Sequence, residues 1–194
     1  MQTSRSLALA AGAALICIAA CATSGAGRTA SSAGAAFADV AKVLRHPRCM
    51  NCHPSGDRPR VGDQRRLHPQ NVMRGPANHG MPAMHCATCH RPENLDHAGV
   101  PGAPSWHLAP RSMGWEGLDD RALAEALKDP AKNGGRSLDD MIEHLERDPL
   151  VGWGWAPGAG REPIPLPRAA FVEAFRSWVR LGAELPPAGT TTTF

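Results

Sequence analysis

Aromatic residues are scarce in this 194-residue chain, which contains no tyrosine, four phenylalanines and five tryptophans. Little aromatic surface is therefore available for a hydrophobic core, and the 20 glycines and 18 prolines are typical of a loop-rich protein. The formal charge of +3 is spread along the chain without the clustered basic residues of a nucleic-acid-binding protein, so we expect no nucleic-acid partner. The apolar run Leu7 to Ala20 is too short for a comfortable membrane span.

Cysteine is also limited, and its positions leave none for a structural disulfide. Of the six cysteines, four lie in two short motifs, Cys17 lies within the apolar N-terminal run, and Cys21 lies just after it. A chain with a small core and no disulfide needs another source of apolar surface. Large bound cofactors are one such source.

The two motifs, Cys49 to His53 and Cys86 to His90, both read Cys-x-x-Cys-His. This pentapeptide is the signature of covalent haem c attachment, because two cysteines at this spacing form thioethers with the two vinyl groups of one haem. The histidine that follows is then held beneath the iron as an axial ligand. The sequence therefore predicts two covalently bound haem c groups. The predicted thioether cysteines are Cys49, Cys52, Cys86 and Cys89, and the predicted proximal iron ligands are His53 and His90.

Three other uses of paired cysteines remain open. Two such pairs can hold a structural zinc ion, although a zinc site has no use for a histidine directly after each pair. A thioredoxin-like redox centre needs one motif in a βαβ setting, not two in loop-rich sequence. Two disulfides suit a secreted chain but leave both histidines unexplained. Haem attachment accounts for the cysteines and the histidine of both motifs.

Residues 1–20 are predicted to form a signal peptide. Arg5 is the only charge in this segment, and it precedes the apolar run, as in secretory leaders. Haem c is attached after export, so the predicted compartment agrees with the two motifs.

The segment Ile18 to Cys21 resembles a bacterial lipobox. We therefore expect Cys21 to be lipidated and to become the mature N-terminus, with the Ser-, Ala- and Gly-rich residues 21–34 as a flexible tether. Ala22 follows in place of an aspartate, which favours sorting to the outer membrane, on its periplasmic side. The alternative is ordinary signal cleavage nearby, which gives a soluble periplasmic protein.

Helical periodicity predicts a mainly α, loop-rich fold. Apolar residues recur at helix spacing in four segments, as Phe37, Val40 and Leu44 do in the first. One set of helices flanks both motifs and no full-length repeat is present, which indicates a single cytochrome c-like domain over residues 35–187, wrapped around both haems. The predicted helices cover 35–46, 118–128, 137–148 and 168–181, with N-caps at Asp119 and Ser137 and a C-terminal cap at Gly182. Residues 54–85 and 91–117 are predicted to be loops, and residues 188–194 a disordered tail.

The sixth iron ligands are less specified by the sequence, since either histidine or methionine serves. We prefer His68, in a long loop after the first motif, and His144, on the edge of the apolar face of a predicted helix. Met113, between Pro110 and Trp115, is the preferred methionine. Each of the three has a packing or surface role as its alternative.

The chain resembles a small family of dihaem cytochromes that are often described as the cytochrome subunit of isoquinoline 1-oxidoreductase-type molybdenum hydroxylases. The resemblance extends over roughly residues 37–185 and implies electron transfer without specifying the substrate that is oxidised upstream. The resemblance rests on the following segments: His46 to Pro54, Gly56-Asp57, Gly62-Asp63, Pro101 to Pro104 with Trp106, Asp129-Pro130 with Asn133-Gly134, and Asp148 to Val151 with Trp153 to Trp155.

We therefore expect an electron carrier and not an enzyme in its own right. It would pass electrons from a dehydrogenase, for example a molybdenum hydroxylase, to a cytochrome or an oxidase. The alternative is a small dihaem enzyme, such as a peroxidase or a thiosulfate-type oxidoreductase, with one open haem position and an acid–base group beside it. His79, His107 and Glu116 are the candidates for that group. A haem-based sensor or assembly factor is a third hypothesis, which the lack of an effector domain disfavours.

Overall fold

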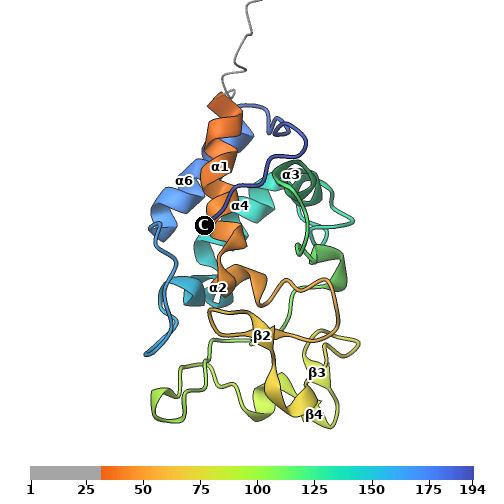
Figure 1. Ribbon diagram of the computed structural model, residues 1–194, viewed down its shortest axis with the longest axis vertical. Coiled ribbons are helices and arrows are strands. Elements are labelled where there is room, and N and C mark those ends of the chain that lie inside the picture. The colour runs from red at the N-terminus through yellow and green to blue at the C-terminus, as the bar shows by residue number, and fades with distance from the viewer. Residues whose placement is uncertain (1–31) are drawn as a thin grey trace, which may run out of the picture.

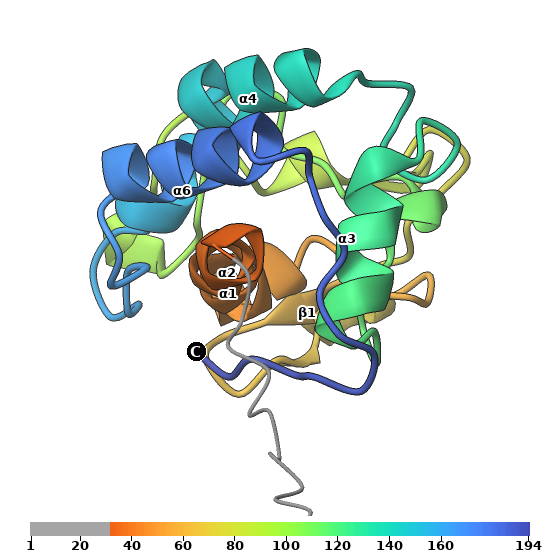
Figure 2. The same cartoon turned by 90° about the horizontal axis from the view of Figure 1, so that it is seen from above.

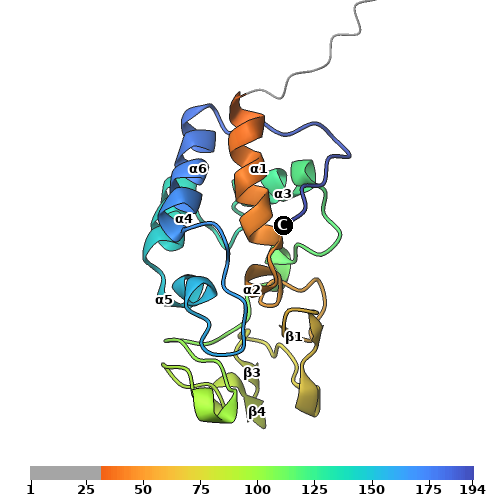
Figure 3. The ribbon, with the colours of Figure 1, turned by 60° about the vertical axis from the view of Figure 1, so that its left-hand side comes forward.

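The computed structural model describes residues 32–194 and is mainly α, with four longer helices in one half of the molecule and two small β-hairpins in the other (Figures 1 and 3). Within this part of the chain, no helix has the length and apolarity needed to cross a membrane. The predicted signal peptide, Cys21 and most of the predicted tether lie outside the described residues. The longer helices are α1 (Ser32–Arg45), α3 (Asp120–Lys128), α4 (Leu138–Arg147) and α6 (Arg168–Arg180).

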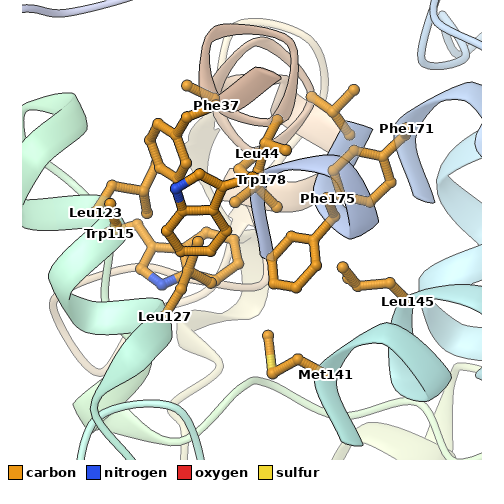
Figure 4. Packing of buried hydrophobic residues seen from close by; sticks show 14 of the residues in the cluster. Phe37, Leu44, Trp115, Leu123, Leu127, Met141, Leu145, Phe171, Phe175 and Trp178 are labelled. Carbon is orange, nitrogen blue, oxygen red and sulfur yellow. The ribbon is translucent and has the colours of Figure 1, made fainter. Parts of the chain in front are cut away.

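Helices α1 and α6 pack along each other and form the centre of the hydrophobic core, with α4 beside α6 (Figure 2). Trp178 of α6 is fully buried between Phe37 of α1 and Phe175, at ring-centroid distances of 5.0 and 5.4 Å (Figure 4). Its indole Nε1 donates a hydrogen bond of 2.9 Å to the Glu184 carbonyl, so the burial leaves no unsatisfied polar group. Full burial of a side chain such as Phe37 or Phe175 stabilises the fold by about 1.5–3 kcal/mol.

The predicted caps at the helix ends are confirmed. Asp119 accepts a hydrogen bond of 2.8 Å from the Ala122 amide at the start of α3. Ser137 and Asp140 exchange hydrogen bonds in a reciprocal capping box at the start of α4. Gly182 follows α6 with φ of +86°, a left-handed conformation that a residue with a Cβ adopts at a cost.

The half of the molecule opposite the helical core consists of loops, short helical turns and two hairpins. The sequence predicted loops over most of this region and no strands. The strands were not predicted because each is only two residues long, which is too short to show a period-two pattern. The hairpins pair β1 (Arg60–Val61) with β2 (Arg66–Leu67) and β3 (Gly80–Met81) with β4 (Met84–His85), both antiparallel. The short helices are α2 (Pro47–Met50) and α5 (Pro149–Gly152), and the 3-10 turns are η1 (Pro69–Asn71), η2 (Cys86–Thr88), η3 (Asp96–Ala98), η4 (Arg111–Met113) and η5 (Trp153–Trp155).

The C-terminal segment, expected to be a disordered tail, is instead hydrogen-bonded to α3. The Thr192 amide and hydroxyl both donate to the Asp120 carboxylate, the hydroxyl at 2.6 Å. The Asp120 amide donates to the Thr190 carbonyl at 2.8 Å. Phe194 then lies edge-on to His46, at 5.4 Å between ring centroids. A buried carboxylate with free acceptor positions is what orders this polar segment, and the local sequence of the tail does not reveal that.

Candidate functional site

Both Cys-x-x-Cys-His motifs lie on short helical turns that a preceding histidine caps. The His46 Nδ1 atom accepts a hydrogen bond from the Arg48 amide and begins α2, which carries Cys49. The His85 Nδ1 atom accepts one from the Ala87 amide and begins η2, at the second motif. Each turn presents its two cysteines toward a cavity. His46 and His85 thereby have structural roles at Nδ1.

The first cavity is lined by Cys49, Cys52 and His53, with Met113 and His144 also in its wall. It lies at the base of the helical core and has a volume of about 120 Å³. The walls of this cavity must therefore separate when a group as large as a porphyrin enters. Its lining is mostly apolar and aromatic, as in cofactor sites generally.

His53 is held from two directions. Its Nδ1 atom donates a hydrogen bond of 2.9 Å to the Met113 carbonyl, since a carbonyl oxygen can only accept. The Trp115 indole stacks on the imidazole at 3.5 Å, with the planes 9° apart. Burial lowers the pKa of His53 to about 3, so the ring is neutral and its Nε2 is available as a ligand.

His144 lies in the same cavity on α4. Its Nδ1 atom is 3.1 Å from an Asp148 carboxylate oxygen, one helical turn further on. Burial and the positive charge of Arg136 lower the pKa of His144, against the opposing effect of Asp148. A neutral imidazole whose Nδ1 is bonded to a carboxylate is the usual arrangement of a histidine that ligates a metal through Nε2. The structure thus brings two of the predicted site residues, His53 and His144, to one cavity.

Met113 contacts His53 through its backbone. Its carbonyl accepts the hydrogen bond from the His53 Nδ1 atom, which is the side of that ring away from Nε2. The side chain is 4% exposed and belongs to the hydrophobic core. The Met113 backbone carbonyl therefore orients the His53 ring, and Met113 also lines the first cavity together with His144.

The second cavity is larger, about 620 Å³, which lies within the roughly 300–1,000 Å³ typical of cofactor pockets. It lies among the hairpins and loops and is lined by Cys86, Cys89, His90 and His68. In contrast to the first motif, whose turn is largely buried, Cys89 is exposed.

His68 and His90 both line this cavity, with ring centroids 6.1 Å apart and ring planes at 69°. The Nδ1 atom of His90 donates to the Pro101 carbonyl and that of His68 to the Pro69 carbonyl, both at 2.7 Å. Both Nε2 atoms are therefore left as potential ligands. Two imidazoles on opposite sides of one metal ion, with metal–nitrogen bonds of roughly 2.0 Å, have their ring centroids roughly 6 Å apart.

The two cavities share a wall. Arg48, Cys52, His107 and Trp153 line both of them. The Trp106 ring stacks on His90 at 4.7 Å and meets Trp153 edge-on at 5.0 Å. An aromatic series thus connects the second motif to the shared wall.

The four motif cysteines form no disulfide within the described residues. Burial is the main reason why the pKa of Cys49 rises to about 12 and that of Cys52 to about 11, and burial also raises the pKa of Cys86. A thioredoxin-like redox centre depends on a thiol pKa that is lowered, so these environments oppose that alternative. Among residues 32–194, no group of three or more His, Cys, Asp or Glu side chains is arranged to hold a metal ion.

Several residues that the sequence did not single out support this arrangement. Arg74 is 4% exposed and donates to the carbonyls of Pro54, Gly56 and Ala109, joining the loop after the first motif to the loop before Met113. A buried arginine bonded to carbonyls has no local sequence signal. Asp148, by contrast, stands one helical turn after His144, and that spacing was available as a signal.

The three candidate acid–base groups of the enzyme hypothesis are dispersed. Glu116 pairs with Arg60 and Arg65, at 3.2 and 2.7 Å, and accepts from the Ser55 amide, so it joins the first hairpin to the loop after His53. His79 lies between the rings of His85 and His107. Of the three, only His107 lines the cavities.

Comparisons with models of protein families, with curated proteins and with solved structures found no match for this chain.

Proposed function

We propose that this protein is a dihaem c-type cytochrome that carries electrons. The observation that carries the proposal is that the cysteines and the histidine of each Cys-x-x-Cys-His motif line one cavity together, with further histidines, His144 in the first and His68 in the second among them, in the same wall. In each case the Nδ1 atoms are engaged within the protein, and the Nε2 atoms are left for iron. The donor set is therefore the one that a six-coordinate haem c requires.

In the second cavity, His90 and His68 would be the two axial ligands. Their ring separation of 6.1 Å agrees with the spacing of two imidazoles on one metal ion. Cys86 and Cys89 would carry the thioether bonds. The Pro69 and Pro101 carbonyls fix the orientation of both rings before iron binds.

In the first cavity, His53 and His144 would be the axial ligands, with Cys49 and Cys52 as the thioether residues. We prefer His144 to Met113 because the Met113 backbone supports His53 on its Nδ1 side. Two histidine ligands generally give a lower reduction potential than histidine with methionine.

Bound haem would supply reversible one-electron exchange at iron, and the protein would supply ligation, environment and contact with partners. The shared wall places the two sites next to each other, which suits electron transfer between them. The partly exposed second motif is the side from which a redox protein can approach, whereas the first motif lies against the helical core. We therefore infer that electrons enter or leave the molecule through the second site.

The partners and the location follow from the sequence features. The signal peptide, the lipobox ending at Cys21 and the resemblance to the dihaem family support a periplasm-facing lipoprotein, favoured at the outer membrane, with a soluble periplasmic form as the alternative. Its donor would be a dehydrogenase, for example a molybdenum hydroxylase, and its acceptor a cytochrome or an oxidase. A Cys21→Ser variant tests the anchor, since it is expected to move the haem-stained protein from the membrane fraction to the soluble fraction.

The deciding experiment is expression with a haem c maturation system, followed by the pyridine haemochrome assay, EPR and carbon monoxide titration. The proposal expects two covalent haems per chain, both low-spin when oxidised, and neither binding carbon monoxide. Failure to retain haem after denaturation and acid–acetone extraction would exclude covalent attachment. A high-spin haem that binds carbon monoxide and turns over peroxide would favour the small dihaem enzyme instead.

A further inference from the structure

Arg48 is a buried cation on the wall shared by the two cavities. The residue is 4% exposed, and its guanidinium carbon lies 5.8 Å from the centre of the Trp153 ring. It forms an ion pair with Asp63, whose side chain is 39% exposed. Within the described part of the chain, the Arg48 Nε atom has no hydrogen-bond partner. A buried guanidinium N–H without an acceptor is costly, so an acceptor from outside the chain is expected there.

Arg161 brings a second guanidinium to the same cavity. It lines the second cavity with Arg48 and is held by the carbonyls of Pro157 and Gly99. Burial lowers the pKa of Arg48, and the charge of Arg161 lowers it further. Two like charges that line one largely apolar cavity repel each other, and an anion beside both, in addition to the Asp63 partner of Arg48, would offset this repulsion.

We propose that Arg48 and Arg161 bind a propionate carboxylate of the haem that is attached to Cys86 and Cys89. This inference rests on the proposed function. The propionates lie on the edge of the porphyrin opposite the two vinyl positions. Because Arg48 directly precedes Cys49, its backbone would lie beside the thioether edge of the first haem, away from the propionates of that haem. Arg48 also lines the second cavity, and Arg161 lines the second cavity but not the first, so we assign the carboxylate to the second haem.

Arginine is well suited to this role because its planar fork matches a carboxylate and stays charged in a buried setting. The pair would hold the second haem in the cavity at the edge away from its covalent bonds. It would also tune the iron, since nearby positive charge disfavours the ferric state and raises the reduction potential. Arg48 links the sites, because it is anchored beside the first haem and contacts the second.

The test is a spectroelectrochemical titration of the full-length holoprotein and of the Arg48→Gln and Arg161→Gln variants. Each variant is expected to lower the potential of the second haem by a shift equivalent to about a tenfold change in the reduction equilibrium, or about 59 mV for a one-electron couple. Arg48→Lys, which keeps the charge, should shift it less. A His68→Ala variant identifies the second haem, because the redox step that it alters belongs to that site.

Arg66→Gln is the matched control. Arg66 lies on β2 at the same end of the molecule but lines neither cavity, and its loss removes the same formal charge. The inference is overturned if neither cavity variant shifts the second potential beyond this control, or if the two variants shift different haems. Arg161 is partly exposed, so the Arg161→Gln variant still tests the propionate contact even if Arg48→Gln does not fold. The absence of covalent haem would refute the proposed function itself, whereas two normal haems with unshifted potentials would refute only this assignment.

Discussion

Each of the four histidines that we assign to iron uses its Nδ1 atom for a hydrogen bond within the protein. Three of them donate to a backbone carbonyl, and His144 pairs with the Asp148 carboxylate. Such a bond fixes the tautomer and the ring orientation, and a carboxylate partner also makes the imidazole a stronger donor. His46 and His85 differ, because their Nδ1 atoms accept from backbone amides at helix starts. The state of Nδ1 thus separates these four histidines from the two capping ones, and His107, whose Nδ1 atom donates to the Ser105 carbonyl, shares it with the four.

Replacement of His68 or His144 by alanine is expected to leave one haem five-coordinate in each variant. The measurement is EPR with carbon monoxide titration, and each variant should show one high-spin haem and bind one equivalent of the gas. His107→Ala and Met113→Leu are the matched controls from the cavity walls, and both should keep two low-spin haems. If His107→Ala opens the first haem while His144→Ala does not, His107 is the sixth ligand there.

At the scale of elements, the start of α3 connects three parts of the chain. Asp119 caps the helix and also accepts from the Gly189 amide at 2.8 Å. Asp120 is 2% exposed and pairs with Arg45 of α1 at 2.7 Å, while Thr192 of the C-terminal segment donates to its other oxygen. Two adjacent aspartates therefore join α1, α3 and the C-terminus.

Asp120→Ala is expected to destabilise the protein by about 3–5 kcal/mol, because it leaves the partly buried Arg45 charge without its partner. Urea unfolding followed by circular dichroism measures this loss. The double variant Arg45→Met, Asp120→Leu removes both charges and should recover most of the stability. A single variant with wild-type stability would show that the pair contributes little.

Asp119 should contribute a pH-dependent part of the stability. Hydrogen bonds from the Ala122 and Gly189 amides hold the pKa of Asp119 below its usual range. The unfolded chain therefore takes up this proton first as the pH falls, so the contribution is complete above about pH 4 and disappears as the pH passes the folded pKa. Asp119→Asn keeps a capping acceptor without the charge. The urea midpoint of unfolding of this variant should approach that of the wild type as the pH falls from roughly 5 to 2. A constant difference between the two midpoints over this pH range would contradict the prediction.

At the scale of the whole molecule, the two halves differ in how they are stabilised. The helical half has a continuous core built on α1, α3, α4 and α6. Between residues 51 and 102, by contrast, Pro54 is the only fully buried apolar side chain among the described residues. If the proposed haem occupies the second cavity, the hairpin half would depend on it for apolar contact.

Loss of the second haem should accordingly unfold one half of the molecule more than the other. In a Cys86→Ala, Cys89→Ala variant, limited proteolysis is expected to cut first between residues 55 and 102 and to leave the helical half resistant. Mass spectrometry of the fragments identifies the sites.

Removal of both haems, with all four motif cysteines replaced, should destabilise the whole domain. A cooperative thermal transition equal to that of the holoprotein would contradict this dependence.

Much of the helical half was predictable from local pattern. The apolar repeats, together with the caps at Asp119, Ser137 and Gly182, identified four helices to within a few residues, because helix signals lie within one or two turns of chain. The two-residue strands and the ordered C-terminus were not predicted. Their positions depend on partners distant in sequence, as Asp120 is for Thr192.

By itself, the sequence predicted two haem-attachment motifs and their histidines, because thioether chemistry requires cysteines at one local spacing. It also named His68 and His144 as candidates, but only as histidines in suitable segments. The tertiary structure decided that each shares a cavity with one motif, and that the Met113 carbonyl accepts a hydrogen bond from His53. Such choices depend on which loops meet across the fold, and long-range contacts leave no periodic signal in the chain. The same holds for Arg48, which precedes one motif in sequence and reaches the cavity of the other only in the folded protein.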